Sequence, residues 1–306
     1  MKAIRFEQYG PPEVLALHEV AEPHPRAGEI RIRVRAAGVN GLDWKIRAGL
    51  VRELYEVNLP SGSGIDAAGV VDEVGADVTD VRLGDAVFGC GTGVLAEYAV
   101  LGFWAHKPDS LSFEEAAGYP IPVETAFRIL DQVGIQPGQT LLISGASGGV
   151  GSAAAQIARY RGITVIGTAG AARQHYLRTL GVEPTTYGDG WVDRVRALAP
   201  TGIDAALDIS GSGVVADCVA LTGDPSKVLS IADFTAPQHG AQVSFAPTEV
   251  PVALRAAAAL HVEGGLTIPV ERTFALAEAA AAQAHVAAGH AAGRTVVIVS
   301  GEEATT

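Results

Sequence analysis

A glycine-rich turn between an apolar run and an alanine-rich segment is the part of this chain best suited to hold phosphate groups. The apolar residues 141–143 lead through Gly145 into Ala146-x-Gly148-x-x-Gly151, and a helix pattern over 153–159 follows. A strand, a tight glycine turn and a helix N-terminus bind a dinucleotide pyrophosphate on free backbone N–H groups. We expect Gly148 to let phosphates approach the backbone and Gly151 to let the helix pack on the strand. The residues expected at the cofactor here are Ala146, Ser147, Gly148, Gly149, Val150 and Gly151.

The residues after this turn indicate which dinucleotide binds. A chain that binds NAD places an Asp or Glu about twenty residues further on, where the acid bonds the ribose hydroxyls. No acidic residue occurs between Gly151 and Glu183, and small residues after a strand at 163–167 lead to Arg173. A small loop followed by an arginine suits a dianionic 2′-phosphate, so the sequence favours NADPH. The alternative for Arg173 is a solvated residue that begins a helix. The residues expected around the adenosine end are Thr168, Gly170, Arg173 and Tyr187.

Two further loops follow strands in the same region, Asp208-Ile-Ser-Gly-Ser-Gly213 and Ser230-Ile-Ala-Asp-Phe234. Open α/β sheets bind their ligands at the carboxyl ends of the strands. The backbone of the second loop is therefore expected to face the nicotinamide amide, although both loops could be ordinary connections. The residues expected at the cofactor from these loops are Ser210, Ile231, Asp233 and Phe234.

The spacing of apolar residues divides the chain into three parts that must position these groups. Residues 1–115 read as short strands with glycine turns, and 116–255 alternates strands with helices. The remainder predicts a strand at 266–268, a helix over 275–288 and a strand at 294–299. The expected fold class is α/β: a mostly-β domain (1–115 and 256–306) plus a doubly wound parallel-sheet domain (116–255).

Composition excludes several function classes. The 306 residues suffice for two domains, and a net charge of −12 argues against nucleic acid and an anionic membrane surface as partners. Two cysteines, Cys90 and Cys218, cannot build a disulfide framework and suit a reducing cytoplasm. No signal peptide or membrane span is visible, so we expect a cytoplasmic protein.

A series of short motifs occurs in a fixed order along nearly the whole chain. The motifs are Ala36-Ala-Gly-Val-Asn40-x-x-Asp43-Trp-Lys45-x-Arg47-x-Gly49, Gly64-x-Asp66, Val81-x-x-Gly-Asp85, Ala96-Glu-Tyr, Thr125-Ala, Gly145-Ala-Ser-Gly-Gly-Val-Gly151 and Gly289-His-x-x-Gly293-Arg294. With these motifs the chain resembles the zinc-free quinone oxidoreductase branch of the medium-chain dehydrogenase/reductase superfamily.

The resemblance implies a GroES-like catalytic domain, a Rossmann domain, an active-site cleft between them and a homodimer. It also implies that Asn40 lies at that cleft, where it would position the nicotinamide ribose or the substrate, and it offers Thr125 as a cofactor-facing hydroxyl. Arg294 would reach the 2′-phosphate or just terminate the final strand.

The same resemblance argues against a metal. Zinc-dependent relatives have a cysteine where this chain has Asn40 and Gly-His-Glu where it has Gly64-Ile65-Asp66. Zinc needs thiolate, imidazole or carboxylate ligands that converge, and Ile65 supplies none. The histidines show no ligand spacing: His285 and His290, for example, are five residues apart and do not share a helix face. We expect no metal.

Without a strong Lewis acid, the substrate must already accept a hydride readily, which points to a quinone or an α,β-unsaturated carbonyl. The catalytic candidates are Asn40, Lys45, as a donor of a hydrogen bond or proton, and Asp43, whose carboxylate could instead only anchor its loop. Many quinone reductases have a tyrosine at the Lys45 position, whereas relatives acting on reactive enones often carry Asp-Trp-Lys. The sequence therefore predicts an NADPH-dependent reductase of a quinone or enone. The alternatives are a tailoring reductase of a biosynthetic pathway and a non-catalytic NADPH-binding sensor or structural protein.

Overall fold

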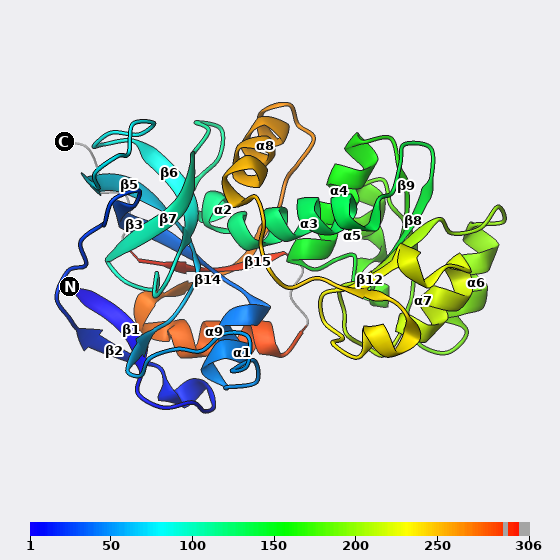
Figure 1. Cartoon of the computed structure of the whole chain (residues 1–306), viewed down its shortest axis with the longest axis horizontal. Coiled ribbons are helices and arrows are strands. Elements are labelled where there is room, and N and C mark those ends of the chain that lie inside the picture. The colour runs from blue at the N-terminus through cyan, green and yellow to red at the C-terminus, as the bar shows by residue number, and fades with distance from the viewer. Residues whose placement is uncertain (290–292, 300–306) are drawn as a thin grey trace. The chain divides into compact units, whose positions relative to one another are not determined.

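The computed structural model describes residues 1–289 and 293–299, and its contacts divide the chain into two compact units (Figure 1). The first unit comprises Met1–Ile121, Val250–Val262 and Ile268–Thr306, and the second comprises Pro122–Glu249 and Glu263–Thr267. His290 is among the residues that lie outside the described ranges. The functional domain limits expected at 115/116 and 255/256 stay a prediction, since these units are defined by contacts alone.

The first unit is built on two sheets whose pairings are antiparallel except between its last two strands. The smaller sheet has the order β2-β1-β4, and the larger has the order β14-β15-β3-β5-β6-β7. The strands are β1 (Lys2–Phe6), β2 (Ala16–Glu19), β3 (Ile30–Val39), β4 (Ser61–Gly62), β5 (Asp66–Val74), β6 (Ala86–Gly91), β7 (Tyr98–His106), β14 (Val270–Ala275) and β15 (Arg294–Ile298).

Strand β3 organises the larger sheet because it pairs with three other strands. Its first half pairs with β7 and its second half with β15, while β5 pairs along most of its length. The pairing of β3 with β7 closes β3, β5, β6 and β7 into a barrel. Ile30, Ile32 and Val34 are fully buried in the core of this barrel, which is the period-two burial expected of a strand with one solvent-facing side.

The α-helices that the structure describes within the first unit are α1 (Gly41–Arg47), α2 (Phe113–Ala117), α8 (Val250–Val262) and α9 (Ala279–Ala287). The helix expected over 275–288 begins instead as a 3-10 turn, Leu276–Glu278, before α9. The strand expected at 266–268 is wrong. The side-chain amide of Gln156 accepts from the Thr267 N–H and donates to the Thr267 carbonyl, and Pro269 has no N–H. The backbone at 266–268 therefore pairs with no neighbouring strand.

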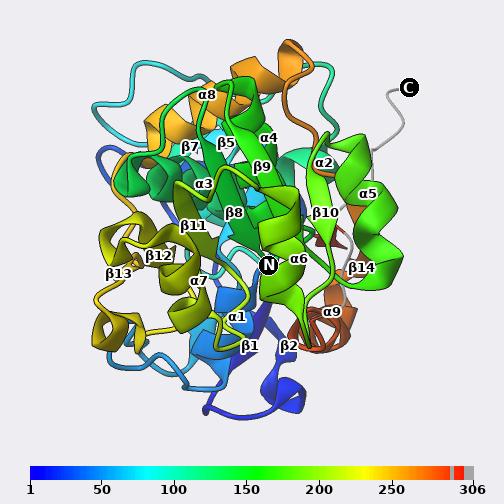
Figure 2. The ribbon, with the colours of Figure 1, turned by 90° about the vertical axis from the view of Figure 1, so that its right-hand side faces the viewer.

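The second unit contains a six-stranded, wholly parallel sheet with the order β10-β9-β8-β11-β12-β13. Figure 2 shows these strands in that order, from β10 on the right to β13 on the left. The strands that follow β8 in sequence are added first on one side of it, as β9 and β10, and then on the other side, as β11, β12 and β13. The order of the strands therefore reverses at β8. The strands are β8 (Thr140–Ser144), β9 (Thr164–Thr168), β10 (Glu183–Thr185), β11 (Ala205–Asp208), β12 (Val228–Ser230) and β13 (Gln242–Val243).

Apolar residues explain why β8 is central. Leu141, Leu142 and Ile143 are all fully buried, as a parallel strand covered on both faces requires. The helices of this part of the chain are α3 (Pro120–Val133), which starts just before the limit of the unit, α4 (Gly149–Tyr160), α5 (Gln174–Thr179), α6 (Trp191–Leu198) and α7 (Val215–Thr222). The expected fold class, a mostly-β domain plus a doubly wound parallel sheet, is confirmed. Of the helices in the described ranges, none has the length and apolar content needed to span a membrane.

Candidate active site

The glycine turn after β8 has two glycines with different reasons for lacking a side chain. Gly145 adopts a φ of +83°, which favours glycine, and a Cβ on Gly151 would collide with the carbonyl oxygen of Gly145. Gly148 has an ordinary φ of −76°, and a Cβ there would meet no protein atom closer than 3.8 Å. Folding therefore requires Gly145 and Gly151, whereas the protein itself leaves open space in front of Gly148.

The start of α4 fits an anionic group in that space. Gly148 is the N-cap residue and supplies no side-chain cap, so the first backbone N–H groups of a twelve-residue helix are not capped by it. Uncapped N–H groups and the helix dipole together favour a phosphate. Ser147, Gly149 and Val150 are half-buried around this helix start. Ala146 is fully buried and donates its N–H to the carbonyl oxygen of Thr168 at 3.0 Å, so that N–H is not a phosphate donor.

The carboxyl end of β9 carries the residues expected around an adenosine end. A Cβ on Gly170 would lie 3.5 Å from the hydroxyl of Tyr187, so these two residues are neighbours, and Tyr187 is 63% exposed. Arg173 closes the 3-10 turn Ala171–Arg173, with its N–H donating to the Gly170 carbonyl. Thr168 is buried, and its hydroxyl oxygen accepts from the Gly145 N–H at 3.3 Å. Its side chain thus supports the glycine turn.

On the other side of β8, a buried carboxylate joins three loops. Asp208 ends β11 and is fully buried. Its Oδ1 accepts from the Ser210 hydroxyl at 3.1 Å and the Gly211 N–H at 3.0 Å, and its Oδ2 accepts from the Ser230 hydroxyl at 2.8 Å. The Ser144 and Ser210 hydroxyls lie 2.8 Å apart, which links this group to the end of β8.

The loop after β12 is shaped by the same group. Ser230 Oγ accepts from the Asp233 N–H at 2.8 Å, and the Ile231 N–H donates to the Asp208 carbonyl at 3.0 Å. The Asp233 carboxylate accepts from the N–H and hydroxyl of Thr235, which holds the pKa of Asp233 below its usual value. Phe234 is 49% exposed, so this loop presents an aromatic side chain to solvent.

Asp208, Ser230 and Ser144 were not among the expected site residues. The signal for Asp208 is an acid that ends the apolar run Ala205-Ala-Leu, at the carboxyl edge of the sheet.

In the first unit, four polar residues form a buried cluster that we call the Asn40 cluster: Asn40, Asp43, Asp66 and Arg294. The Asn40 Nδ2 donates to Asp66 Oδ2 at 2.9 Å, and its Oδ1 accepts from Arg294 at 2.8 Å. The Asn40 N–H donates to Asp43 Oδ2 at 2.7 Å, which caps α1. Asp66 also accepts from the Ile121 N–H at 3.1 Å and lies 3.4 Å from the Arg294 guanidinium.

Burial shifts the pKa values of the ionisable groups in the Asn40 cluster. Removal from water raises the pKa of Asp43 to about 7 and that of Asp66 to about 6, against the opposing effects of Arg294 and of hydrogen bonds from Asn40. The pKa of Arg294 is lowered, also by burial. Asp43 Oδ1 is buried and has no hydrogen-bond partner among the described residues. Two carboxyls face one guanidinium, so the cluster can hold a proton near neutral pH.

The structure corrects the expectation that Arg294 binds a 2′-phosphate. Its guanidinium is committed to Asn40 and Asp66 inside the first unit, and its side chain is only 8% exposed. A buried cation already paired with a carboxylate is not available to a phosphate.

Lys45 and Thr125 have different surroundings from each other. Lys45 is half-buried, and its ammonium lies 5.9 Å from the Trp44 ring centroid. The Thr125 hydroxyl is buried and accepts from Arg128 at 3.4 Å, and Arg128 in turn pairs with Glu124.

The residues at the positions of a zinc site do not fit zinc. Ile65 has no ligand atom, and Asp66 is already bonded to Asn40 and Arg294. Cys90 lies 3.9 Å from Asp66 Oδ1, which gives a thiol and one carboxylate but no third ligand. No group of three potential ligands occurs within residues 1–289 and 293–299.

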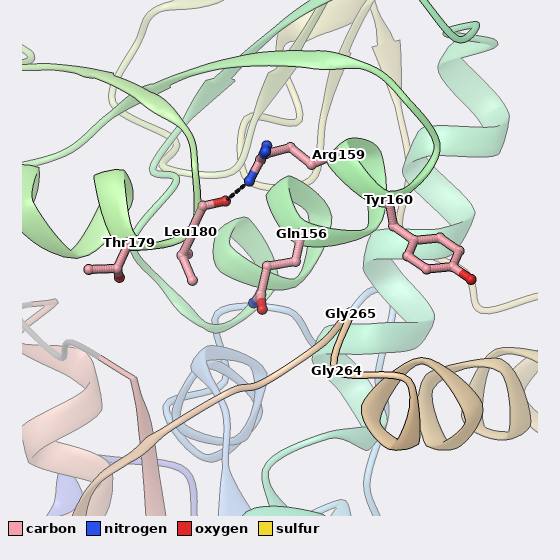
Figure 3. Close-up of a pocket in the computed structure, with 7 residues that line it drawn as sticks. All are labelled: Gln156, Arg159, Tyr160, Thr179, Leu180, Gly264 and Gly265. Carbon is pink, nitrogen blue, oxygen red and sulfur yellow. Dashed lines mark hydrogen bonds between the residues drawn. The ribbon is translucent and has the colours of Figure 1, made fainter.

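A polar pocket of about 310 Å³ opens at the far end of α4 from the glycine turn (Figure 3). The Arg159 guanidinium donates across it to the Leu180 carbonyl, and the Gln156 amide is bonded to Thr267. Its polar side chains are thus used within the protein, and we assign no ligand to it. The lining residues are Gln156, Arg159, Tyr160, Thr179, Leu180, Gly264 and Gly265.

Comparison with known proteins agrees with this division. Residues 26–107 match the family model described as an alcohol dehydrogenase GroES-like domain, and 149–249 match the one described as a zinc-binding dehydrogenase. The chain is 34% identical to a quinone oxidoreductase of Pseudomonas aeruginosa over 97% of this chain and 99% of that protein. The structure of a quinone oxidoreductase from Coxiella burnetii is 33% identical, with a TM-score of 0.87 and coverage of 98% and 99% of the two chains. A mycobacterial protein solved in complex with NADPH is 26% identical, with a TM-score of 0.87 and coverage of 98% and 100%.

Proposed function

The chain belongs to the zinc-free quinone oxidoreductase branch of the medium-chain dehydrogenase/reductase superfamily, and we propose that it reduces a quinone or an α,β-unsaturated carbonyl with NADPH. It is an oxidoreductase with a nicotinamide cofactor. The choice of NADPH over NADH, the substrate class and the role of each site residue are parts of the proposal.

The observation that most directly supports a bound dinucleotide is the open space in front of Gly148. Gly148 needs no positive φ, and a Cβ there would meet no protein atom closer than 3.8 Å, yet the position lies against N–H groups of α4 that its side chain does not cap. A pyrophosphate at this helix start accounts for both facts. The adenosine end would then extend over β9 toward Gly170, Arg173 and Tyr187, where the arginine and the phenol are suited to a 2′-phosphate.

Bound NADPH supplies a hydride, and the first unit supplies polar groups for the substrate. Asn40 has its amide orientation fixed by Arg294 and Asp66, which leaves one Nδ2 hydrogen for the ribose or the substrate. The role proposed for the Lys45 ammonium is to donate a hydrogen bond to the oxyanion that develops on a reduced carbonyl. The Asn40 cluster holds a proton near neutral pH, and Asp43 is its member with an unoccupied oxygen.

The proposed reaction does not use zinc, because the side chains at Asn40, Ile65 and Asp66 do not form a zinc site. The proposal also includes a cytoplasmic location, a homodimeric assembly and a small-molecule substrate.

The test is NADPH oxidation by the pure protein with a panel of quinones and enones, with NADH assayed in parallel. Protein prepared without added zinc is assayed with and without a chelator. The proposal expects turnover of one substrate class, a preference for NADPH and no effect of the chelator. Tight NADPH binding without turnover would favour a sensor, or an enzyme for a biosynthetic intermediate outside the panel. A lack of affinity for either cofactor would refute the proposal.

A further inference from the structure

Asp208 is a buried carboxylate without a cationic partner. It is fully buried, and within the described residues no ion pair includes it. A buried charge is costly unless hydrogen bonds replace its lost water. Ser210, Gly211 and Ser230 each donate to it, at 2.8–3.1 Å.

The donors around the Asp208 carboxylate are themselves held by further hydrogen bonds. The Ser210 hydroxyl donates to Asp208 and has the hydroxyls of Ser144 and Ser212 within 2.8 Å, so each of these can donate to Ser210 in turn. Ser210 and Ser230 thus donate to the carboxylate directly, while Ser144 and Ser212 support Ser210. Charge-assisted hydrogen bonds of this kind are stronger than those between neutral groups.

The topology indicates which part of a dinucleotide would lie near this charge. The sheet order reverses at β8, and ligands of open α/β sheets bind across such a point. With the pyrophosphate at the start of α4, the adenosine end extends over β9 and the nicotinamide end over β11 and β12. Asp208 ends β11, directly beside the end of β8 at Ser144.

We propose that the charge of Asp208 favours the oxidised form of the bound nicotinamide over the reduced form and thereby promotes hydride release. The proposal rests on the proposed function. In hydride transfer the ring loses a C–H bond with its electron pair, which forms the new bond to the acceptor; the ring becomes a cation, and the reduced acceptor takes up a proton. A fixed negative charge nearby, at low dielectric, stabilises the positively charged ring and leaves the neutral one unaffected. Asp208 acts through its charge and through the loops that it holds, so it is a positioning residue rather than a catalytic one.

The experiment compares the dissociation constants of NADP⁺ and NADPH in the full-length protein, by titration calorimetry and by the fluorescence of the reduced cofactor. The variants are Asp208→Asn, which removes the charge, and Ser230→Ala, which removes one hydrogen bond to the same carboxylate and keeps the charge. Circular dichroism and thermal melting check that each variant is folded. The ratio Kd(NADP⁺)/Kd(NADPH) is expected to rise about tenfold in Asp208→Asn, which is the effect of a unit charge acting over about 12 Å at an effective dielectric constant near 20. The ratio in Ser230→Ala is expected to stay within about twofold of the wild-type value, because a lost hydrogen bond weakens both forms alike.

Each outcome decides something. An unchanged ratio in Asp208→Asn, or an equal rise in Ser230→Ala, overturns the role of the charge while the reductase function stands. If Asp208→Asn does not fold, Asp208→Ser carries the same test, since it is neutral and smaller. Failure of both variants to fold assigns the carboxylate to stability and overturns the proposal. A wild-type protein that binds neither cofactor refutes the proposed function and this inference together.

Discussion

The Arg294 guanidinium donates to the Asn40 amide oxygen at 2.8 Å, although 254 residues separate the two in the chain. The amide nitrogen of Asn40 donates to Asp66, so the two bonds fix which way the amide faces. An amide held from both ends presents its remaining hydrogen in one direction only. Arg294 is thus a residue that positions Asn40.

Replacement of Arg294 tests this role against the phosphate role that the sequence suggested. Arg294→Ala is expected to lower kcat/KM at least about tenfold, since it frees the Asn40 amide and leaves Asp66 without its cation. The dissociation constant of NADPH should change less than about threefold, because no phosphate contact is lost. Steady-state kinetics and cofactor titration measure the two effects. Arg272→Ala, on the exposed face of the neighbouring strand β14, is the matched control. A selective loss of NADPH over NADH affinity in Arg294→Ala would restore the phosphate role.

Gly148→Val tests the glycine turn as a cofactor site. Because a Cβ at Gly148 meets no protein atom within 3.4 Å, the variant is expected to fold with a Tm within about 3 °C of the wild type. Its side chain would fill the space for the pyrophosphate, so NADPH affinity should fall at least about a hundredfold. Calorimetric titration and thermal melting give both values. Gly102→Val, another glycine with open space around it, is the control and should bind normally. Full affinity in Gly148→Val would place the cofactor elsewhere.

Arg173→Ala tests the preference for the 2′-phosphate. The loss of one charge-assisted, bidentate contact is expected to weaken NADPH binding by about tenfold to a hundredfold and to leave NADH binding within about twofold. The ratio of kcat/KM for the two cofactors reports the same difference. Arg178→Ala, on the exposed side of α5, is the control. Equal weakening of both cofactors would show that Arg173 does not contact the phosphate.

The two buried carboxyls predict how stability depends on pH. Burial raises the folded-state pKa of Asp43 to about 7 and of Asp66 to about 6, above the ordinary value of 3.8. Between about pH 4 and 7 the folded state therefore binds more protons than the unfolded state, so these groups lower the free energy of unfolding as pH rises.

Asp43→Asn removes one of these titrations and keeps an oxygen that can accept from the Asn40 N–H. At pH 8 its Tm is expected to exceed that of the wild type by roughly 3–6 °C, and near pH 4 the two should agree. Thermal melts across this range provide the measurement. Asp109→Asn, at an exposed position, is the control. A Tm difference that does not vary with pH would contradict the raised pKa.

Local patterns predicted the parts of the protein that local interactions determine. The turn through Gly145 and Gly151 was predictable because both glycines are required by local structure. Gly145 has a positive φ, and a Cβ on Gly151 would collide with the carbonyl oxygen of Gly145. The fold class was predictable because the apolar periodicity of strands and helices is also a local property of the sequence.

Long-range polar contacts were not predictable. Arg294 was expected at a phosphate because its partner Asp66 is 228 residues away and no periodicity connects them. Asp208 passed as a loop residue, since its role depends on Ser230 in another strand. The prediction of a strand at 266–268 was wrong because the side-chain amide of Gln156, far away in sequence, forms the hydrogen bonds of the Thr267 backbone.

The pairing of β15 with the second half of β3 has a consequence for the synthesis of this protein. Val39 precedes Asn40 and pairs with Thr295, which follows Arg294, so β15 brings the guanidinium to the Asn40 amide. Proteins emerge from the ribosome N-terminus first, and early segments begin to fold before later ones exist. During that interval, Asp66 and Asn40 lie in a nascent chain that has no β15 and no Arg294. The Asn40 cluster is thus completed only after β15 has been synthesised, and a chain interrupted between β14 and β15 would lack an intact cluster.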